Sequence, residues 1–104
     1  MSNAIQNIKH HFSDGLYAKE IIFKKDSLIV QHKHNYSHLS VLAKGKVKIA
    51  FDDGKLLEVS APSCLNIEAD KHHSIIALED CVWFCIHATD ETDHNKIDKV
   101  LIKE

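Results

Sequence analysis

The sequence predicts a single all-β domain, built as a small barrel or a two-sheet sandwich. From Leu16 onward, short stretches rich in β-branched and aromatic residues are separated by turn residues at intervals of roughly 8 to 12 residues. The chain has 104 residues, too few for two independent cores. Its hydrophobic fraction of 44% is ordinary for a globular protein. We therefore expect one compact core enclosed by strands.

The expected strands are bounded by residues that favour turns. Strands are predicted at 18–24, 27–32, 38–43, 46–51, 55–60, 64–68, 73–78 and 82–88. Asp53 and Gly54 suit a tight hairpin turn that requires positive φ, and Gly45 ends a strand. Pro62 cannot donate a hydrogen bond to a central ladder, so it marks another break.

The C-terminal residues follow a different pattern. They are polar and acidic up to Asn95, and then Ile97, Val100 and Leu101 lie at helical spacing. We therefore expect a single domain over 1–104, with its core at about 16–88 and a C-terminal tail or short helix over 89–104.

Charge and hydropathy exclude two classes of partner. The chain has 13 basic side chains, all of them lysine, against 15 acidic ones, for a net charge of −2. Without a basic cluster, nucleic acid is not an expected partner. No apolar stretch is long enough to cross a membrane, and the N-terminus lacks the pattern of a signal peptide. A cytoplasmic location is expected.

The three cysteines predict no disulfide and no zinc knuckle. Cys64, Cys81 and Cys85 are odd in number and lack Cys-x-x-Cys spacing. Cys81 and Cys85 lie four residues apart on one predicted strand, which separates them by about 13 Å. We expect all three to be small buried side chains, in a reducing compartment.

Histidines supply the strongest functional signal. Nine occur in the chain, and His32 and His34 are two residues apart on one strand, so their side chains project from the same face. His38 follows after three residues, which lets a short turn return it beside them. Imidazole suits iron, manganese, nickel, copper and zinc, and a barrel interior leaves open positions on such a metal for a substrate.

This segment resembles the first cupin motif, which reads His-x-His, three or four residues, Glu, six residues, Gly. His32, His34 and Gly45 match it, and His38 takes the place of the glutamate. Asp26 stands where the motif has an earlier glycine. The resemblance covers roughly 16–88 and implies a double-stranded β-helix, or jelly roll.

The second cupin motif is matched only at its histidine, aligned with His73. Glu68, Asp70, Ala77 and Pro62 stand where that motif has proline, glycine, asparagine and its first glycine. His72 is the alternative, because a shift of one residue turns a strand side chain to the opposite face. We favour His73, since the motif places it at the start of a strand. Glu68 is a further candidate ligand.

The resemblance implies a divalent transition metal held by four histidines: His32, His34, His38 and His73. Iron or manganese is favoured, and zinc, nickel and copper also suit such a site. Four neutral imidazoles leave the full +2 charge on the metal, which favours an anionic ligand at its open positions.

Other residues are candidates for the surroundings of that metal. Tyr36 and Ser40 share strand parity with the histidines, and Tyr36 is the candidate for proton transfer. Asn66 and Trp83 are candidate wall residues. Whether Trp83 and His87 or their neighbours face the interior stays open, because both faces of that strand are largely apolar.

Three functions are compatible with these residues. The favoured one is a metal-dependent oxygenase or related oxidoreductase that acts on a small, preferably anionic molecule. One alternative is a lyase or isomerase in which Tyr36 transfers the proton, and another is a non-catalytic module that binds a metal or small ligand. A homodimer is expected, with Ile21, Ile22 and Phe23 on an edge strand that adds to the partner's sheet.

Overall fold

The computed structural model describes residues 7–31, 37–67 and 72–89, without the side chains of Val30 and Gln31. Within these residues the regular structure is entirely β-strand, which confirms the all-β prediction. The strands are β1 (Asn7–Ser13), β2 (Leu16–Phe23), β3 (Leu28–Gln31), β4 (His38–Lys44), β5 (Lys46–Phe51), β6 (Leu56–Ser60), β7 (Ser63–Ile67), β8 (His73–Ala77) and β9 (Cys81–Ala88).

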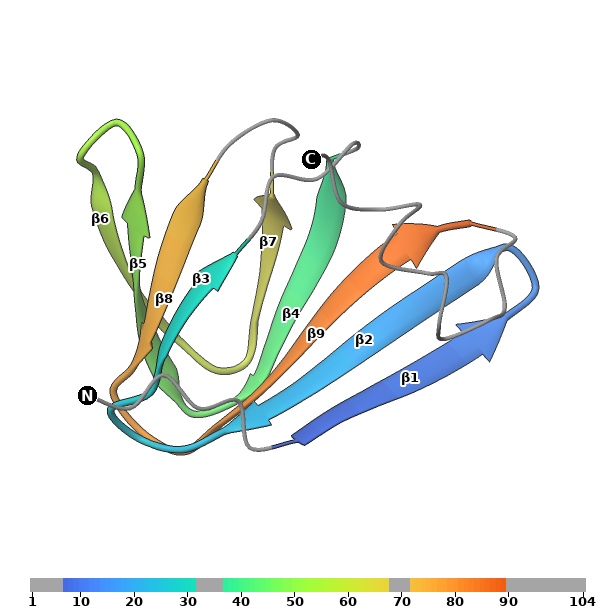
Figure 1. The fold of residues 1–104 in the computed structure, drawn as a ribbon, viewed down its shortest axis with the longest axis horizontal. Coiled ribbons are helices and arrows are strands. Elements are labelled where there is room, and N and C mark those ends of the chain that lie inside the picture. Colours follow the sequence, from blue (N-terminus) through green and yellow to red (C-terminus); the bar gives the residue numbers. More distant parts are fainter. Residues whose placement is uncertain (1–6, 32–36, 68–71, 90–104) are drawn as a thin grey trace.

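The strands form two antiparallel sheets, with the orders β1-β2-β9-β4-β7 and β3-β8-β5-β6. Figure 1 shows the two sheets close together at the lower end and spread apart at the upper end. From β2 to β5, and again from β6 to β9, successive strands alternate between the sheets, as in a jelly roll. The C-terminal tail or helix expected after Thr89 lies outside the described residues.

The interior between the sheets is filled by every second residue of the strands. The largest fully buried side chains include Trp83, Tyr17, Phe23 and Leu42, and each contributes on the order of 1.5–3 kcal/mol by leaving water. Trp83 belongs to a row on β9 whose buried members are Cys81, Trp83, Cys85 and His87. This alternation decides the question that the sequence left open, since His87 faces inward with Trp83.

One expectation about the N-terminal part was wrong, and one strand was not predicted. β1 pairs with β2 from Asn7 opposite Ile22 to Ser13 opposite Leu16, ahead of the buried hydrophobic residues, which begin at Tyr17. Most of β1 is exposed, and an exposed edge strand does not need the apolar alternation that marks a buried one. Because β2 lies between β1 and β9, Ile21–Phe23 is not the edge of the sheet.

The backbone explains the residues at the two glycine positions of the first motif, where this chain has Asp26 and Gly45. Asp26 has a φ of 71°, in the left-handed region where aspartate is one of the better tolerated side chains. Gly45, between β4 and β5, has a φ of +95°, and a Cβ there would lie 2.7 Å from Cys81 Sγ and closer still to the carbonyl oxygen of Asp80. Asp26 can therefore replace glycine, whereas Gly45 has no room for a side chain.

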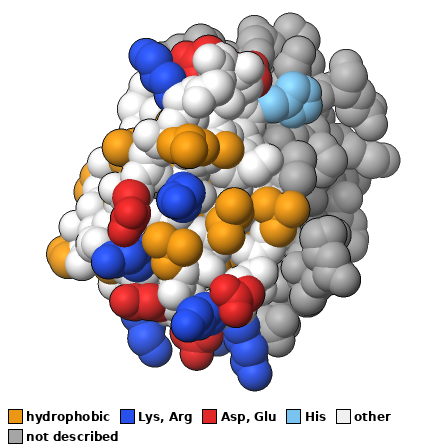
Figure 2. Space-filling view, turned by 90° about the vertical axis from the view of Figure 1, so that its left-hand side faces the viewer, with side chains coloured by type: hydrophobic (Ala, Val, Ile, Leu, Met, Phe, Trp, Pro, Cys, Tyr) orange, Lys and Arg blue, Asp and Glu red, His pale blue; other side chains and the backbone are white. Residues whose placement is uncertain are grey.

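The outer face of the four-stranded sheet is mixed in character. Figure 2 shows separate groups of hydrophobic side chains with lysines and acidic residues between them. Leu56 is 66% exposed and Ile76 is 37% exposed, and Lys46 pairs with Glu58 at 3.7 Å.

Among the described residues there is no helix able to cross a membrane. Cys64 is exposed, so the expectation that all three cysteines are buried was wrong.

Candidate metal and ligand site

The upper, open end of the barrel brings two histidines from opposite sheets to strand ends (Figure 1). His38 is the first residue of β4 and pairs with Ile67, the last residue of β7. His73 is the first residue of β8 and pairs with Gln31, the last residue of β3. Because β4 and β8 begin where β7 and β3 end, both histidines lie at the same end of the molecule.

Both histidines point into the interior. His38 is 4% exposed and His73 is 3% exposed, whereas His72 is exposed and precedes β8. The register that begins the strand at His73 is therefore the one that the fold adopts. The role of either residue as a metal ligand stays a prediction.

The other predicted site residues lie outside the described part of the chain. They are His32, His34, Tyr36 and the further candidate Glu68. Within the described ranges, no group of three or more histidine, cysteine or acidic side chains could hold a metal ion. Of the four predicted ligands, His38 and His73 are described and have buried imidazoles, and nitrogen donors of this kind fit a transition metal.

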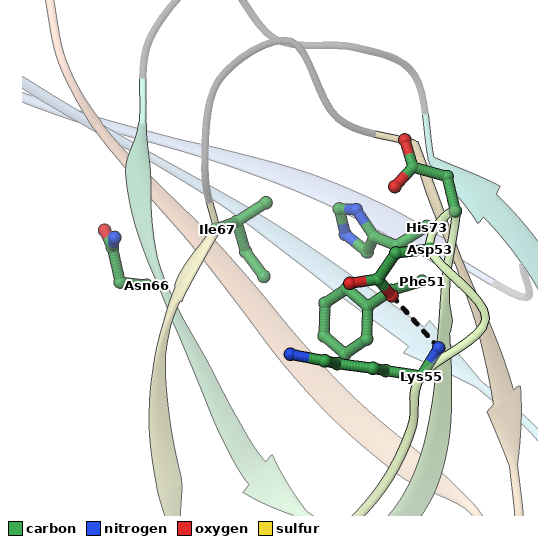
Figure 3. Close-up of a pocket in the computed structure, with 7 residues that line it drawn as sticks. Phe51, Asp53, Lys55, Asn66, Ile67 and His73 are labelled. Carbon is green, nitrogen blue, oxygen red and sulfur yellow. Dashed lines mark hydrogen bonds between the residues drawn. The ribbon is translucent and has the colours of Figure 1, made fainter.

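A cavity of about 310 Å³ opens beside His73. It is lined by Phe51, Asp52, Asp53, Lys55, Asn66, Ile67 and His73. The Phe51 ring lies next to the His73 ring, with centroids 6.2 Å apart and planes inclined by 32°. In Figure 3, Ile67 lies on the far side of the cavity from Lys55's backbone, and the Asn66 side chain points away. The predicted wall residue Asn66 thus borders the cavity, while Trp83 is buried in the core.

The hairpin between β5 and β6 fixes the charged rim of this cavity. Phe51 N–H donates to the Lys55 carbonyl at 2.9 Å, and Gly54 N–H donates to the Phe51 carbonyl at 3.1 Å. An Asp53 carboxylate oxygen accepts the Lys55 N–H at 3.0 Å. The Lys55 side chain extends from this turn toward the strand that carries Ile67 (Figure 3). Sequence reasoning used this hairpin only as a turn signal and missed Phe51 and Lys55.

A third missed residue, His87, lies against His38. The centroids of their rings are 4.4 Å apart, with planes inclined by 30°, and His87 is 5% exposed. The sequence feature that could have identified His87 is the alternation of side chains along β9, but the sequence alone did not decide which of the two alternating sets faces the interior. The nearest buried polar residue on β4, Ser40, donates to Cys85 Sγ at 3.9 Å.

The buried thiols are poor candidates for metal ligands. Burial raises the pKa of Cys85, although the hydrogen bond from Ser40 acts in the opposite direction. Burial also raises the pKa of Cys81, against hydrogen bonds with the Lys46 and Glu79 backbone. A raised pKa keeps these residues as neutral thiols, whereas a metal binds the thiolate.

Comparisons with known proteins support the fold. No protein-family model and no curated protein matches the chain. Among solved structures, NMB1881 from Neisseria meningitidis has a TM-score of 0.70 at 13% identity, covering 83% of this chain and 87% of its own. A cupin-2 domain protein from Shewanella frigidimarina has a TM-score of 0.66 at 16% identity, covering 84% of each chain. KdgF from a Halomonas species has a TM-score of 0.67 at 15% identity, covering 83% and 81%.

Proposed function

From the cupin β-barrel fold, we propose that this protein binds one divalent transition metal at the open end of the barrel. His32, His34, His38 and His73 are the proposed ligands. The observation that carries the proposal is the burial of His38 and His73 at strand ends of opposite sheets, at the end where the cavity opens. Buried imidazoles beside a cavity are the donors that a catalytic metal uses.

Chain connectivity supports the inclusion of the two other histidines. His32 directly follows Gln31, the register partner of His73. Tyr36 directly precedes Ser37, which adjoins His38. The segment that contains His32 and His34 is therefore joined at both ends to residues beside the two buried imidazoles.

The favoured activity is that of an oxygenase or related oxidoreductase acting on a small molecule. Iron or manganese, when bound, would supply redox and Lewis-acid chemistry. The described residues contribute the rest of the site: Phe51 and Ile67 provide apolar walls that exclude water, and Lys55 provides a cation at the rim. Tyr36 is the proposed proton-transfer group if the reaction is redox-neutral.

Oxygen uptake tests this activity. The full-length protein would be loaded with iron, manganese or zinc and offered enolisable diketones, thiols and phenols. We expect steady uptake with iron or manganese and none with zinc, because only the first two change oxidation state. Absence of uptake with either redox metal would reject the oxygenase. Turnover that persists with zinc under argon would identify a lyase or isomerase, and binding without turnover would identify a binding module.

The pocket favours a small anionic ligand with an apolar body. The body would lie between Phe51 and Ile67, and its charged group would face Lys55, which is the only lysine among the described residues that line the cavity. Asp52 and Asp53 bring negative charge to the same rim, although Asp53 accepts the Lys55 N–H. Among the described residues that line the cavity, the favourable place for an anion is therefore the Lys55 end.

Lys55→Gln should lower the affinity for phenylacetate by about two- to fivefold, because an exposed ion pair contributes modestly to binding. The affinity for the neutral phenylacetamide should not change. Lys48→Gln is the matched control, since Lys48 lies on β5 between the buried residues Val47 and Ile49 and so points to the outer face. Calorimetric titration measures all three proteins. Equal loss in both lysine variants would show that net charge, not the pocket, attracts the acid.

Two further expectations stay predictions. Formation of a homodimer would involve β1, the N-terminal edge strand of the five-stranded sheet, and the mass in solution measures it. A cytoplasmic location follows from the sequence features described above.

A further inference from the structure

A row of aromatic rings crosses the inner face of the five-stranded sheet and ends at His38. His10, Phe12, Tyr17, His87 and His38 form it, from β1 through β2 and β9 to β4. Phe12 pairs with Tyr17, and Tyr17 pairs with His87. Leu39 pairs with Ile86 across β4 and β9, so their neighbours His38 and His87 face each other.

The rings are in successive contact. The centroids of His38 and His87 are 4.4 Å apart, those of His87 and Tyr17 are 6.1 Å apart, and the ring planes are inclined by 30° and 23°. Tyr17 is fully buried. Its hydroxyl is held by His10 Nδ1 at 2.7 Å, and Phe12 packs against it at 5.1 Å between centroids. His87 therefore has an ordered ring on each side.

His38 needs such support more than a residue in mid-strand does. It is the first residue of β4, so the strand holds its backbone only on the side of the residues that follow it in the chain. The second side-chain torsion of histidine has a broad, roughly two-fold preference. A metal ligand must present its nitrogen in a narrow range of directions, and loss of a neighbouring group that orients it typically costs about ten- to a hundredfold in metal affinity.

We propose that His87 is a positioning residue that holds the His38 imidazole, by the close packing of its tilted ring, in the orientation that binds the metal. The inference rests on the metal site proposed above. His87 would not coordinate the metal. The hydrogen bond with His10 would fix the Tyr17 ring, and the Tyr17 ring would in turn support the His87 ring.

Cobalt titration of the full-length chain tests this role. His87→Leu and His87→Gln remove the ring, whereas His87→Phe keeps a ring and removes the nitrogens. We expect the two ring-removing variants to bind Co²⁺ about tenfold more weakly, in line with the loss of groups that orient a ligand, and to change the visible absorption of bound Co²⁺. His87→Phe should stay close to the wild type in both measurements. If one ring-removing variant does not fold, the other supplies the comparison.

Phe12→Leu is the matched control, because it removes a ring of the same row that contacts Tyr17 and does not adjoin His38 in the row. It should lower the thermal midpoint and leave the Co²⁺ affinity and spectrum unchanged. If the wild type binds Co²⁺ and the ring-removing variants bind it with the same affinity and the same spectrum, the positioning role alone is overturned. Failure of the wild-type protein to bind any metal would instead reject the metal site, and the positioning role with it.

Discussion

Gly45→Ala is expected to lower the free energy of unfolding by about 3 kcal/mol or more. Gly45 has a φ of +95°, which disfavours any side chain, and an added Cβ would meet Cys81 Sγ at 2.7 Å and the backbone of Asp80. The backbone oxygen cannot move without disturbing the start of β9, which pairs with two strands. Urea denaturation of the two proteins measures the difference.

Gly54→Ala separates the two causes of that loss. Gly54 has a similar φ of +89°, but no heavy atom lies within 4 Å of its Cβ position. It should therefore show the backbone penalty alone, about 1 kcal/mol or slightly more. If the two alanine variants lost the same stability, the contact at Gly45 would have no energetic weight, and the glycine would be required for its backbone conformation only.

The contrast also gives a physical reason for glycine at position 45 of this chain, the residue that matches the glycine of the first cupin motif. Gly45 lies where the chain leaves one sheet and enters the other, directly against the first residue of β9. Its smallness allows β4, β5 and β9 to meet at the closed end of the barrel. The motif residue is thus explained by packing, without reference to a metal.

Strands with a buried face could be predicted from the sequence, because burial imposes an alternating pattern. Ile49 and Val47 on β5, for example, are fully buried between less buried neighbours. The edge strand β1 could not be predicted in this way, since most of its residues are exposed. It is a strand because it pairs with β2, and the local sequence pattern of β1 does not indicate that pairing.

The candidate site was predictable to the extent that it depends on spacing within a strand. The position of His73 at the start of β8 followed from the motif, and the buried side chain agrees with that register. The contacts made by His87 and Lys55 could not be foreseen, because they arise between strands. β9 is apolar on both faces, so its neighbours β2 and β4 decide that His87 faces inward.

His73→Ala is expected to weaken metal binding by at least about a hundredfold, more than the loss of a group that merely orients a ligand. His73 is buried at the open end of the barrel, beside the cavity and next to Phe51. Removing its imidazole would take one of four proposed nitrogen donors from the metal. Competition of the full-length protein with a coloured chelator for Co²⁺ measures the change in affinity.

His72→Ala is the control that makes this result specific, because the two residues are adjacent and only His72 is exposed. It should leave the Co²⁺ affinity unchanged, since its side chain points away from the interior. A loss of binding in His72→Ala and not in His73→Ala would mean that the metal lies outside the barrel. Thermal unfolding without metal distinguishes a lost ligand from a damaged fold. His73→Ala must remain folded while it loses the metal, because the proposed role of His73 is to donate a nitrogen, and the hydrophobic core cluster contains Ile75, Ile49 and Trp83 but not His73.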